Sequence, residues 1–260
     1  MDETATERLP YLTTVYPRRL FRTVERPRAR RGYGAAVAEW TDEMTDDERR
    51  QAVIDLLALL AYTELTAFER LAEDARWAPS IGDKVALAEM AAAEFAHFQV
   101  LRERLEKMGV DAEVSMRPFV APLDAFHDST APSDWLESVV KAYVGDGFAA
   151  DFYREVAEYV DPEARALVLD VLEDTGHAQF AVDHVRAAIA ADSAVAGRLA
   201  LWARRLVGEA LVQAQRVAVD RDALARLLVG GSVDLAAVGQ LLARLTQRHT
   251  ERMAALGLTA

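Results

Sequence analysis

The chain has 260 residues and a formal net charge of −12, is 52% hydrophobic, and contains no cysteine. The lack of cysteine excludes disulfides, cysteine-ligated zinc and thiol catalysis, and it fits a cytoplasmic protein. The acidic balance argues against a surface that binds nucleic acid non-specifically, and the length suits one sizeable domain with a small appendage.

Residues 1–44 are expected to form an irregular N-terminal arm. The first ten residues are acidic and lack the apolar core of a secretory signal. The stretch from Arg18 to Arg31 holds seven arginines against one glutamate. Two interpretations are open for this stretch: a solvated arm that packs on an acidic body, or a patch that contacts an anion or RNA.

Long helices are expected from Thr45 onward. Thr45 precedes two aspartates and predicts an N-cap, Gly109 suits a helix C-terminus, and Asp161-Pro162 again predicts a helix start. The predicted helices cover residues 45–75, 81–108, 133–160, 161–191, 193–219, 221–228 and 232–255. The segment between the second and third helices, 109–132, holds three prolines, so we expect an irregular connection there.

No segment predicts a strand, and no apolar run approaches the ~20 residues that a membrane span requires. The predicted fold class is therefore all-α. We expect three parts: the arm at 1–44, a four-helix bundle at 45–191 with a long crossover between its second and third helices, and additional helices at 192–260 packed on the bundle.

Ionisable side chains lie on the apolar faces of the predicted helices. Glu94 and His97 are three residues apart and therefore share a helix face, and that face also carries Leu87, Met90, Phe98 and Leu101. Because burying an unpaired charge costs several kcal/mol, such groups normally have a partner or a metal.

The same pattern occurs twice in the chain. Asp146 follows Glu64 by 82 residues, and both lie on apolar faces. Asp174 and His177 follow Glu94 and His97 by 80 residues each. Each half therefore has one helix with an inward carboxylate and one helix with carboxylate-x-x-His. Four carboxylates and two imidazoles in a helical core suit two divalent metals, and a donor set without sulfur favours iron or manganese.

Some assignments remain open at this stage. Glu173 is a rival to Asp174, because it lies four residues before His177 and shares a face with it, although the offset of 80 favours Asp174. Glu69 and Asp151 also repeat, 82 residues apart, and are interpreted as outer or surface groups. The competing hypothesis for the whole pattern is a bundle whose inward charges pair with arginine. We expect His127 and His249 at the surface.

Four stretches carry a resemblance to a known family: AYTELTAFERL, AEFAHFQVL, KAYVGDGFAADFYREV and DTGHAQFAV. They resemble the ferritin-like di-iron carboxylate proteins and, among these, the bacterial family similar to the tRNA 2-methylthio-N6-isopentenyladenosine hydroxylase. The resemblance implies a ferritin-like four-helix bundle and places Glu64, Glu94, His97, Asp146, Asp174 and His177 on the metals. The second half departs from the commonest pattern, because it has Asp where that pattern has Glu.

The resemblance implies a non-haem di-iron hydroxylase or monooxygenase that uses O2 and an electron donor, with Mn/Fe as an alternative to two irons. It assigns no catalytic residue beyond the metal ligands. It also implies an isopentenylated tRNA base as the substrate, against which the net charge of −12 weighs. Two further hypotheses are a ferritin-like protein that handles metal or consumes peroxide, and a non-enzymatic bundle with structural metals. A homo-oligomer is compatible with each.

Overall fold

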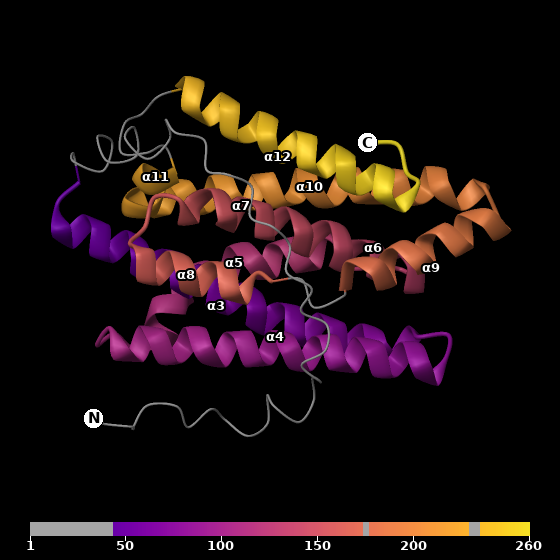
Figure 1. Ribbon diagram of the computed structural model, residues 1–260, viewed down its shortest axis with the longest axis horizontal. Helices are drawn as coiled ribbons and strands as arrows, with labels where there is room; N and C mark the ends of the chain where they lie inside the picture. The colour runs from indigo at the N-terminus through magenta and orange to yellow at the C-terminus, as the bar shows by residue number, and fades with distance from the viewer. Residues whose placement is uncertain (1–43, 174–176, 229–234) are drawn as a thin grey trace, which may run out of the picture. The chain divides into compact units, whose positions relative to one another are not determined.

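The computed structural model describes residues 44–173, 177–228 and 235–260, which belong to one compact unit, Ala35–Ala260 (Figure 1). The arginine-rich stretch of the predicted arm lies outside the described residues. Within these ranges no strand occurs, which confirms the all-α fold class. The longer helices are α3 Asp46–Asp74, α4 Ile81–Lys107, α5 Ala112–Ser129, α6 Trp135–Lys141, α7 Gly147–Ala157, α8 Pro162–Val171, α9 His177–Ala191, α10 Ala194–Asp220, α11 Asp222–Leu228 and α12 Leu235–Leu256.

Three helix ends that the sequence predicts are observed, and each has the capping residue that was expected. The Thr45 side chain accepts a hydrogen bond from the Glu48 amide, and the Glu48 carboxylate accepts one from the Thr45 amide, so both orphan donors are satisfied. Gly109 follows α4 with a φ of 76°, a conformation that favours glycine. Asp161 accepts hydrogen bonds from two amides at the start of α8, and Pro162 occupies the first turn.

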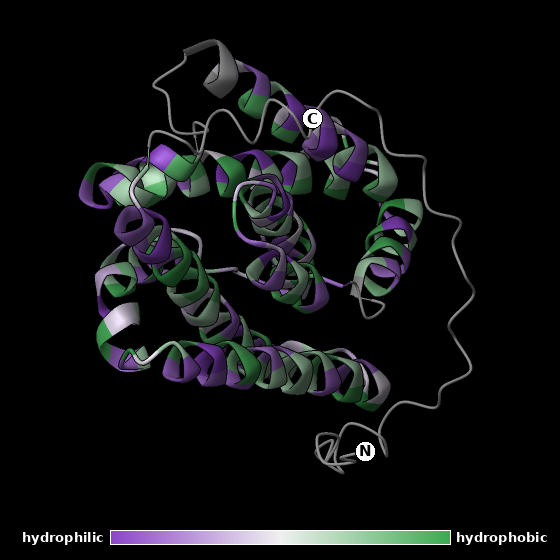
Figure 2. Ribbon diagram, turned by 60° about the vertical axis from the view of Figure 1, so that its left-hand side comes forward, coloured by the Kyte–Doolittle hydropathy of each residue, from purple (hydrophilic) through white to green (hydrophobic). Residues whose placement is uncertain are grey.

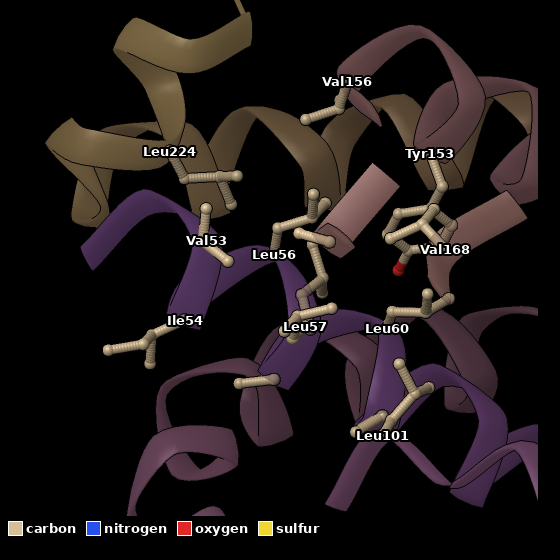
Figure 3. Packing of buried hydrophobic residues seen from close by; sticks show 14 of the residues in the cluster. Val53, Ile54, Leu56, Leu57, Leu60, Leu101, Tyr153, Val156, Val168 and Leu224 are labelled. Atoms are coloured by element: carbon tan, nitrogen blue, oxygen red, sulfur yellow. The ribbon is translucent and has the colours of Figure 1, made fainter. Parts of the chain in front are cut away.

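The core of the bundle is built around α3. Its buried leucines pack with residues of α4, α7, α8 and α11 (Figure 3), among them Leu56, Leu57, Leu60, Leu101, Val156, Val168 and Leu224. Each fully buried leucine contributes roughly 1.5–3 kcal/mol relative to exposure. This rigid core fixes the backbone on which Glu64 sits, because Leu60 and Glu64 are one helical turn apart.

Helix α3 also bears on the question of a membrane. Together with the following turn, Asp46–Trp77 is long and apolar enough to span a membrane by length and composition, contrary to the expectation from the sequence. However, 67% of its most apolar window is buried inside the structure, as in the core helix of a soluble protein. This helix is therefore weak evidence for a membrane span.

The crossover between the second and third helices of the bundle is itself a helix, so the prediction of an irregular connection is wrong. Helix α5 spans 112–129 and contains Pro118 and Pro122. Its apolar residues recur every three or four positions, and Met116 and Phe119 are buried. This apolar face packs on α3 and α10, and we infer that its burial outweighs the proline penalty of about 3 kcal/mol.

The third bundle helix is continuous but not regular. Between α6 and α7 lies a π-helical segment, η3, at Ala142–Asp146. A π segment is produced by one extra residue in a helical turn and frequently marks a functional site. In this protein it ends on Asp146, one of the predicted metal ligands.

The fourth bundle helix, predicted as one segment at 161–191, is interrupted. Helix α8 ends at Val171 and α9 begins at His177, with residues 174–176 outside the described part. The break frees backbone carbonyl groups, and Arg154 of α7 donates a hydrogen bond of 2.6 Å to the carbonyl of Leu172. A side chain from a different helix thus stabilises the interruption, which sequence periodicity alone did not reveal.

The C-terminal helices pack on the bundle. Helix α10 contacts α5 and α6, and α12 contacts α7 and α9. One hydrophobic cluster contains Val139 and Val140 of α6 together with Leu199 and Leu206 of α10 and Met253 of α12. Figure 2 shows hydrophobic and hydrophilic residues mixed along the helices, as expected when each helix buries one face. The predicted division at residues 44 and 191 remains a prediction.

Two histidines expected at the surface are enclosed. His249 is 7% exposed, and the Nδ1 atom of His127 is buried without a hydrogen-bond partner. Burial, with the nearby positive charges of Lys141 and Arg70, lowers the pKa of His127 to about 3. The sequence carried no signal for the surroundings of His127, because the nearby charges of Lys141 and Arg70 come from other helices.

The partly buried His127 should make stability depend on pH. Its pKa in the unfolded chain is near 6.5, so unfolding between pH 3 and 6.5 takes up a proton, and its contribution to stability is lost as pH falls through this range. We expect His127→Gln to reduce the slope of unfolding free energy against pH, between pH 4 and 6, by about 1.4 kcal/mol per pH unit. Urea unfolding followed by circular dichroism at pH 4, 5 and 6 measures this slope. An unchanged slope would contradict the buried neutral state.

Candidate metal centre

Three of the six predicted ligands lie together in the bundle. Glu64 comes from α3, and Glu94 and His97 come from one face of α4. The His97 Nδ1 atom lies 3.3 Å from Glu64 Oε2 and 3.5 Å from Glu94 Oε2. One ligand atom from each residue lies within 4.8 Å of the others. The matched spacing on facing helices therefore produces a compact Glu-Glu-His cluster.

The protonation of this cluster is strongly perturbed. Burial raises the pKa of Glu64 well above its usual range, and the neighbouring Glu94 raises it further. Burial alone would lower the pKa of His97, but hydrogen bonds to Glu64 and Glu94 and their negative charges raise it to about 10. Two carboxylates held this close in a low-dielectric interior need a cation or a proton between them.

The donor set fits a divalent metal ion. The cluster offers carboxylate oxygens and an imidazole nitrogen and no sulfur, which suits iron or manganese. The 6% exposure of Glu64 shows that its carboxylate is removed from bulk water, and no arginine or lysine is paired with it among the described residues. The hypothesis that the inward charges pair with arginine therefore does not describe Glu64. The cluster could hold a metal ion.

The cluster opens on a cavity of about 290 Å³, here called the polar cavity. Asp146, at the end of η3, lines this cavity together with Glu64, Glu94 and His97. Asp146 retains solvent exposure, yet the protein packed around it, followed by the charge of Glu94, raises its pKa well above the usual range. The structure thus brings four of the six predicted ligands to one cavity.

The remaining two predicted ligands are not tested. Asp174 and the side chain of His177 lie outside the described residues, although Ala178, the next residue of α9, lines the polar cavity. Glu173 also lines the polar cavity. The choice between Glu173 and Asp174 therefore stays open, as it did from the sequence.

The polar cavity contains residues that sequence reasoning did not assign. Arg252 of α12 lines it, and its Nη2 atom donates to the Gly147 carbonyl at 2.9 Å and to Asp151 Oδ2 at 2.6 Å. Arg154 of α7 also lines it. Arg252 lies outside the repeat, and the position that matches Arg154 in the first half is Ala72, so the repeat carried no signal for either arginine.

Arg252 connects α12 to the site through its contacts with Asp151 and Gly147. Asp151 is 6% exposed and belongs to the buried charge network between α7 and α12, whereas Glu69, its counterpart in the repeat, is exposed. A Cβ atom added to Gly147 would lie 2.3 Å from the Nε atom of Arg252. A side chain at this position would therefore displace the Arg252 guanidinium, and the glycine itself was the only sequence signal for this close approach.

One wall of the polar cavity is formed by a hydrogen-bonded pair. The hydroxyl oxygens of Thr63 and Tyr153 lie 2.7 Å apart. Since Thr63 donates its own proton to the Leu59 carbonyl at 3.0 Å, Tyr153 is the donor to Thr63. Burial, with the nearby charge of Glu64, raises the pKa of Tyr153 above its usual range, so the phenol keeps its proton.

The helices and their inward carboxylates define the class of this protein as a ferritin-like bundle. The family model described as "Ferritin-like domain, actinomycetes" matches residues 47–231, and the chain belongs to this family. No curated protein matches the chain significantly. Bundles of this class often bind metals between their helices, in agreement with the Glu-Glu-His cluster.

Proposed function

We propose that this protein is a non-haem di-iron hydroxylase that uses O2 and an external electron donor. One observation carries the proposal: the cluster of Glu64, Glu94 and His97 lines a cavity of about 290 Å³ that is partly open to the surface. A site that only stabilises the fold needs no such space. A site that oxidises an organic molecule needs room for O2 and for the reacting part of that molecule.

The metals would be held by two equivalent sets of residues. Glu64, Glu94 and His97 would hold the first ion, and Asp146, Asp174 and His177 the second, with Mn/Fe compatible with the same donors. When bound, two reduced irons supply the activation of O2. The four carboxylates would neutralise most of the charge of two divalent ions, which allows both to lie in an apolar core.

The residues next to two of the predicted ligands are held by hydrogen bonds. Tyr153 holds a proton on its hydroxyl and donates it to Thr63, the residue directly before Glu64. Arg252 fixes the carbonyl of Gly147, the residue directly after Asp146. Both predicted ligands are thus held by a hydrogen bond at the adjacent residue, which limits the freedom of their side chains.

The substrate follows less directly from the site. The resemblance to the tRNA hydroxylase family supports an isopentenylated tRNA base, with Arg18–Arg31 as the RNA contact, in a cytoplasmic enzyme. The net charge of −12 weighs against a polyanionic substrate. The large apolar cavity that shares Thr63 and Tyr153 with the polar cavity favours an organic substrate over metal handling or peroxide consumption.

The test is metal content followed by oxygen consumption. Protein loaded anaerobically with Fe2+ should bind about two ions per chain, as measured by elemental analysis, and should consume O2 faster when an organic substrate is present. Peroxide turnover without an organic substrate would replace the proposal with a metal-handling function. Bound metal without either reactivity would indicate structural ions.

The assignment of the second carboxylate can be tested separately. We expect Asp174→Asn to lower metal content by about one ion per chain, because the 80-residue offset aligns Asp174 with Glu94. Glu173→Gln serves as the matched control, because Glu173 lines the same cavity. Elemental analysis after dialysis distinguishes the two, and a loss confined to Glu173→Gln would move the ligand by one position.

A further inference from the structure

A second and larger cavity lies beside the polar cavity. It has a volume of about 410 Å³ and is here called the apolar chamber. Its walls come from α3, α5, α7, α10, α11 and α12. One apolar lining residue from each helix, in this order, is Leu59, Phe126, Phe148, Ala214, Leu224 and Leu245. The volume lies within the ~300–1,000 Å³ of typical small-molecule sites. The chamber therefore has the size of a binding site.

The lining of the chamber selects for an uncharged ligand. None of the described residues that line it is an aspartate, glutamate, lysine or arginine. Its histidine, His127, is neutral at physiological pH because burial and nearby positive charges lower its pKa to about 3. An apolar lining of this kind favours the uptake of apolar molecules over charged ones. A phosphate, carboxylate or nucleotide would find no charged partner among these residues.

The chamber and the polar cavity share a thin wall. Thr63, Ala149 and Tyr153 line both spaces. The wall is closed by the 2.7 Å hydrogen bond between the hydroxyls of Thr63 and Tyr153, and Thr63 directly precedes Glu64 in the chain. A molecule in the chamber would therefore have one end next to the Glu-Glu-His cluster.

We propose that the apolar chamber binds the hydrocarbon chain of the substrate, an aliphatic chain of about ten carbons, with one end at the wall formed by Thr63 and Tyr153. The volume accommodates this length: at roughly 30 Å³ for each methylene group, taken as similar to a water molecule, ten carbons occupy about 300 Å³ of the 410 Å³. The role of this ligand as a substrate rests on the proposed hydroxylase function. Binding of the ligand to the chamber requires no metal.

The binding test uses the full chain and a neutral fluorescent probe, N-phenyl-1-naphthylamine, displaced by 1-decanol. We expect saturable probe binding, displacement by decanol, and no displacement by 1,6-hexanediol. Ala214→Phe fills the chamber and should weaken decanol binding at least tenfold. Val219→Phe, on the same helix at a position that is 78% exposed, is the matched control and should leave binding unchanged. Ala210→Leu replaces Ala214→Phe if that variant does not fold.

The position of the ligand is tested with Mn2+ alone as the metal. Bound Mn2+ should broaden the proton signals of decanol, and Ala214→Phe should abolish the broadening. Absence of probe binding to the wild-type chain, or equal decanol affinity in wild type and Ala214→Phe, would overturn the chamber proposal. Normal decanol binding by a protein that binds no metal would overturn the hydroxylase function and leave the chamber as a ligand site, so the two failures are distinguishable.

Discussion

His97→Ala is expected to remove about one metal ion per chain and to weaken binding of that ion by roughly a hundredfold or more. The reason is that His97 is the nitrogen donor of the cluster and lies between both carboxylates, 3.3 Å from Glu64 and 3.5 Å from Glu94. Even loss of an outer partner of a metal ligand costs ~10–100-fold in affinity. Elemental analysis and the melting temperature with and without added Mn2+ measure the effect.

The matched control for this change is His184→Ala. His184 pairs with Asp83 at 3.0 Å and lines neither of the two cavities, so its loss should leave metal content unchanged. His177→Ala should remove a second ion if the two halves of the repeat are equivalent. Full metal occupancy in His97→Ala would refute the assignment of the cluster as a metal site.

Gly147→Ala is expected to destabilise the protein by roughly 1–3 kcal/mol, the usual cost of overpacking. An alanine in a helix normally adds up to ~1 kcal/mol of stability relative to glycine. A loss of stability in Gly147→Ala would therefore be opposite to the normal effect of helix propensity. The new Cβ would lie 2.3 Å from Arg252 Nε and force the guanidinium away from Asp151. Urea unfolding measures the free energy of unfolding.

The neighbouring glycine provides the control. A Cβ at Gly145 would meet nothing within 4 Å, so Gly145→Ala should be neutral or slightly stabilising. In an Arg252→Ala background the cost of Gly147→Ala should largely disappear, because the clash has been removed. An equal cost in both backgrounds would show that Arg252 is not the cause.

Much of the fold was readable from the sequence because it depends on local chemistry. Thr45, Gly109 and Asp161 marked helix ends through caps that involve only nearby residues. The errors occurred where tertiary contacts outweigh local preference. The prolines of α5 suggested an irregular connection, yet burial of Met116 and Phe119 stabilises a helix there. The break after Val171 depends on a hydrogen bond from Arg154, which belongs to another helix.

The residues of the candidate site also fall into those that local sequence patterns predict and those that depend on tertiary contacts. Glu64, Glu94 and His97 were predictable because their spacing on two adjacent helices repeats later in the chain, and the structure places them together. Arg252 was not predictable, because it lies outside the repeat and reaches the polar cavity only through the packing of α12 on α7. Periodicity identifies the face of a helix that is directed inward, but it does not identify which other helix packs against that face.

The two cavities are lined in part by α12, a helix that lies beyond the region matched by the family model. The family match ends at residue 231, before α12 begins. Yet Arg252 lines the polar cavity, and Leu241, Leu242 and Leu245 line the apolar chamber. A shortened chain cut to the matched region would therefore retain the Glu-Glu-His cluster but lose part of the enclosure around both spaces. Residues beyond the matched region therefore help to decide which molecules can enter either space.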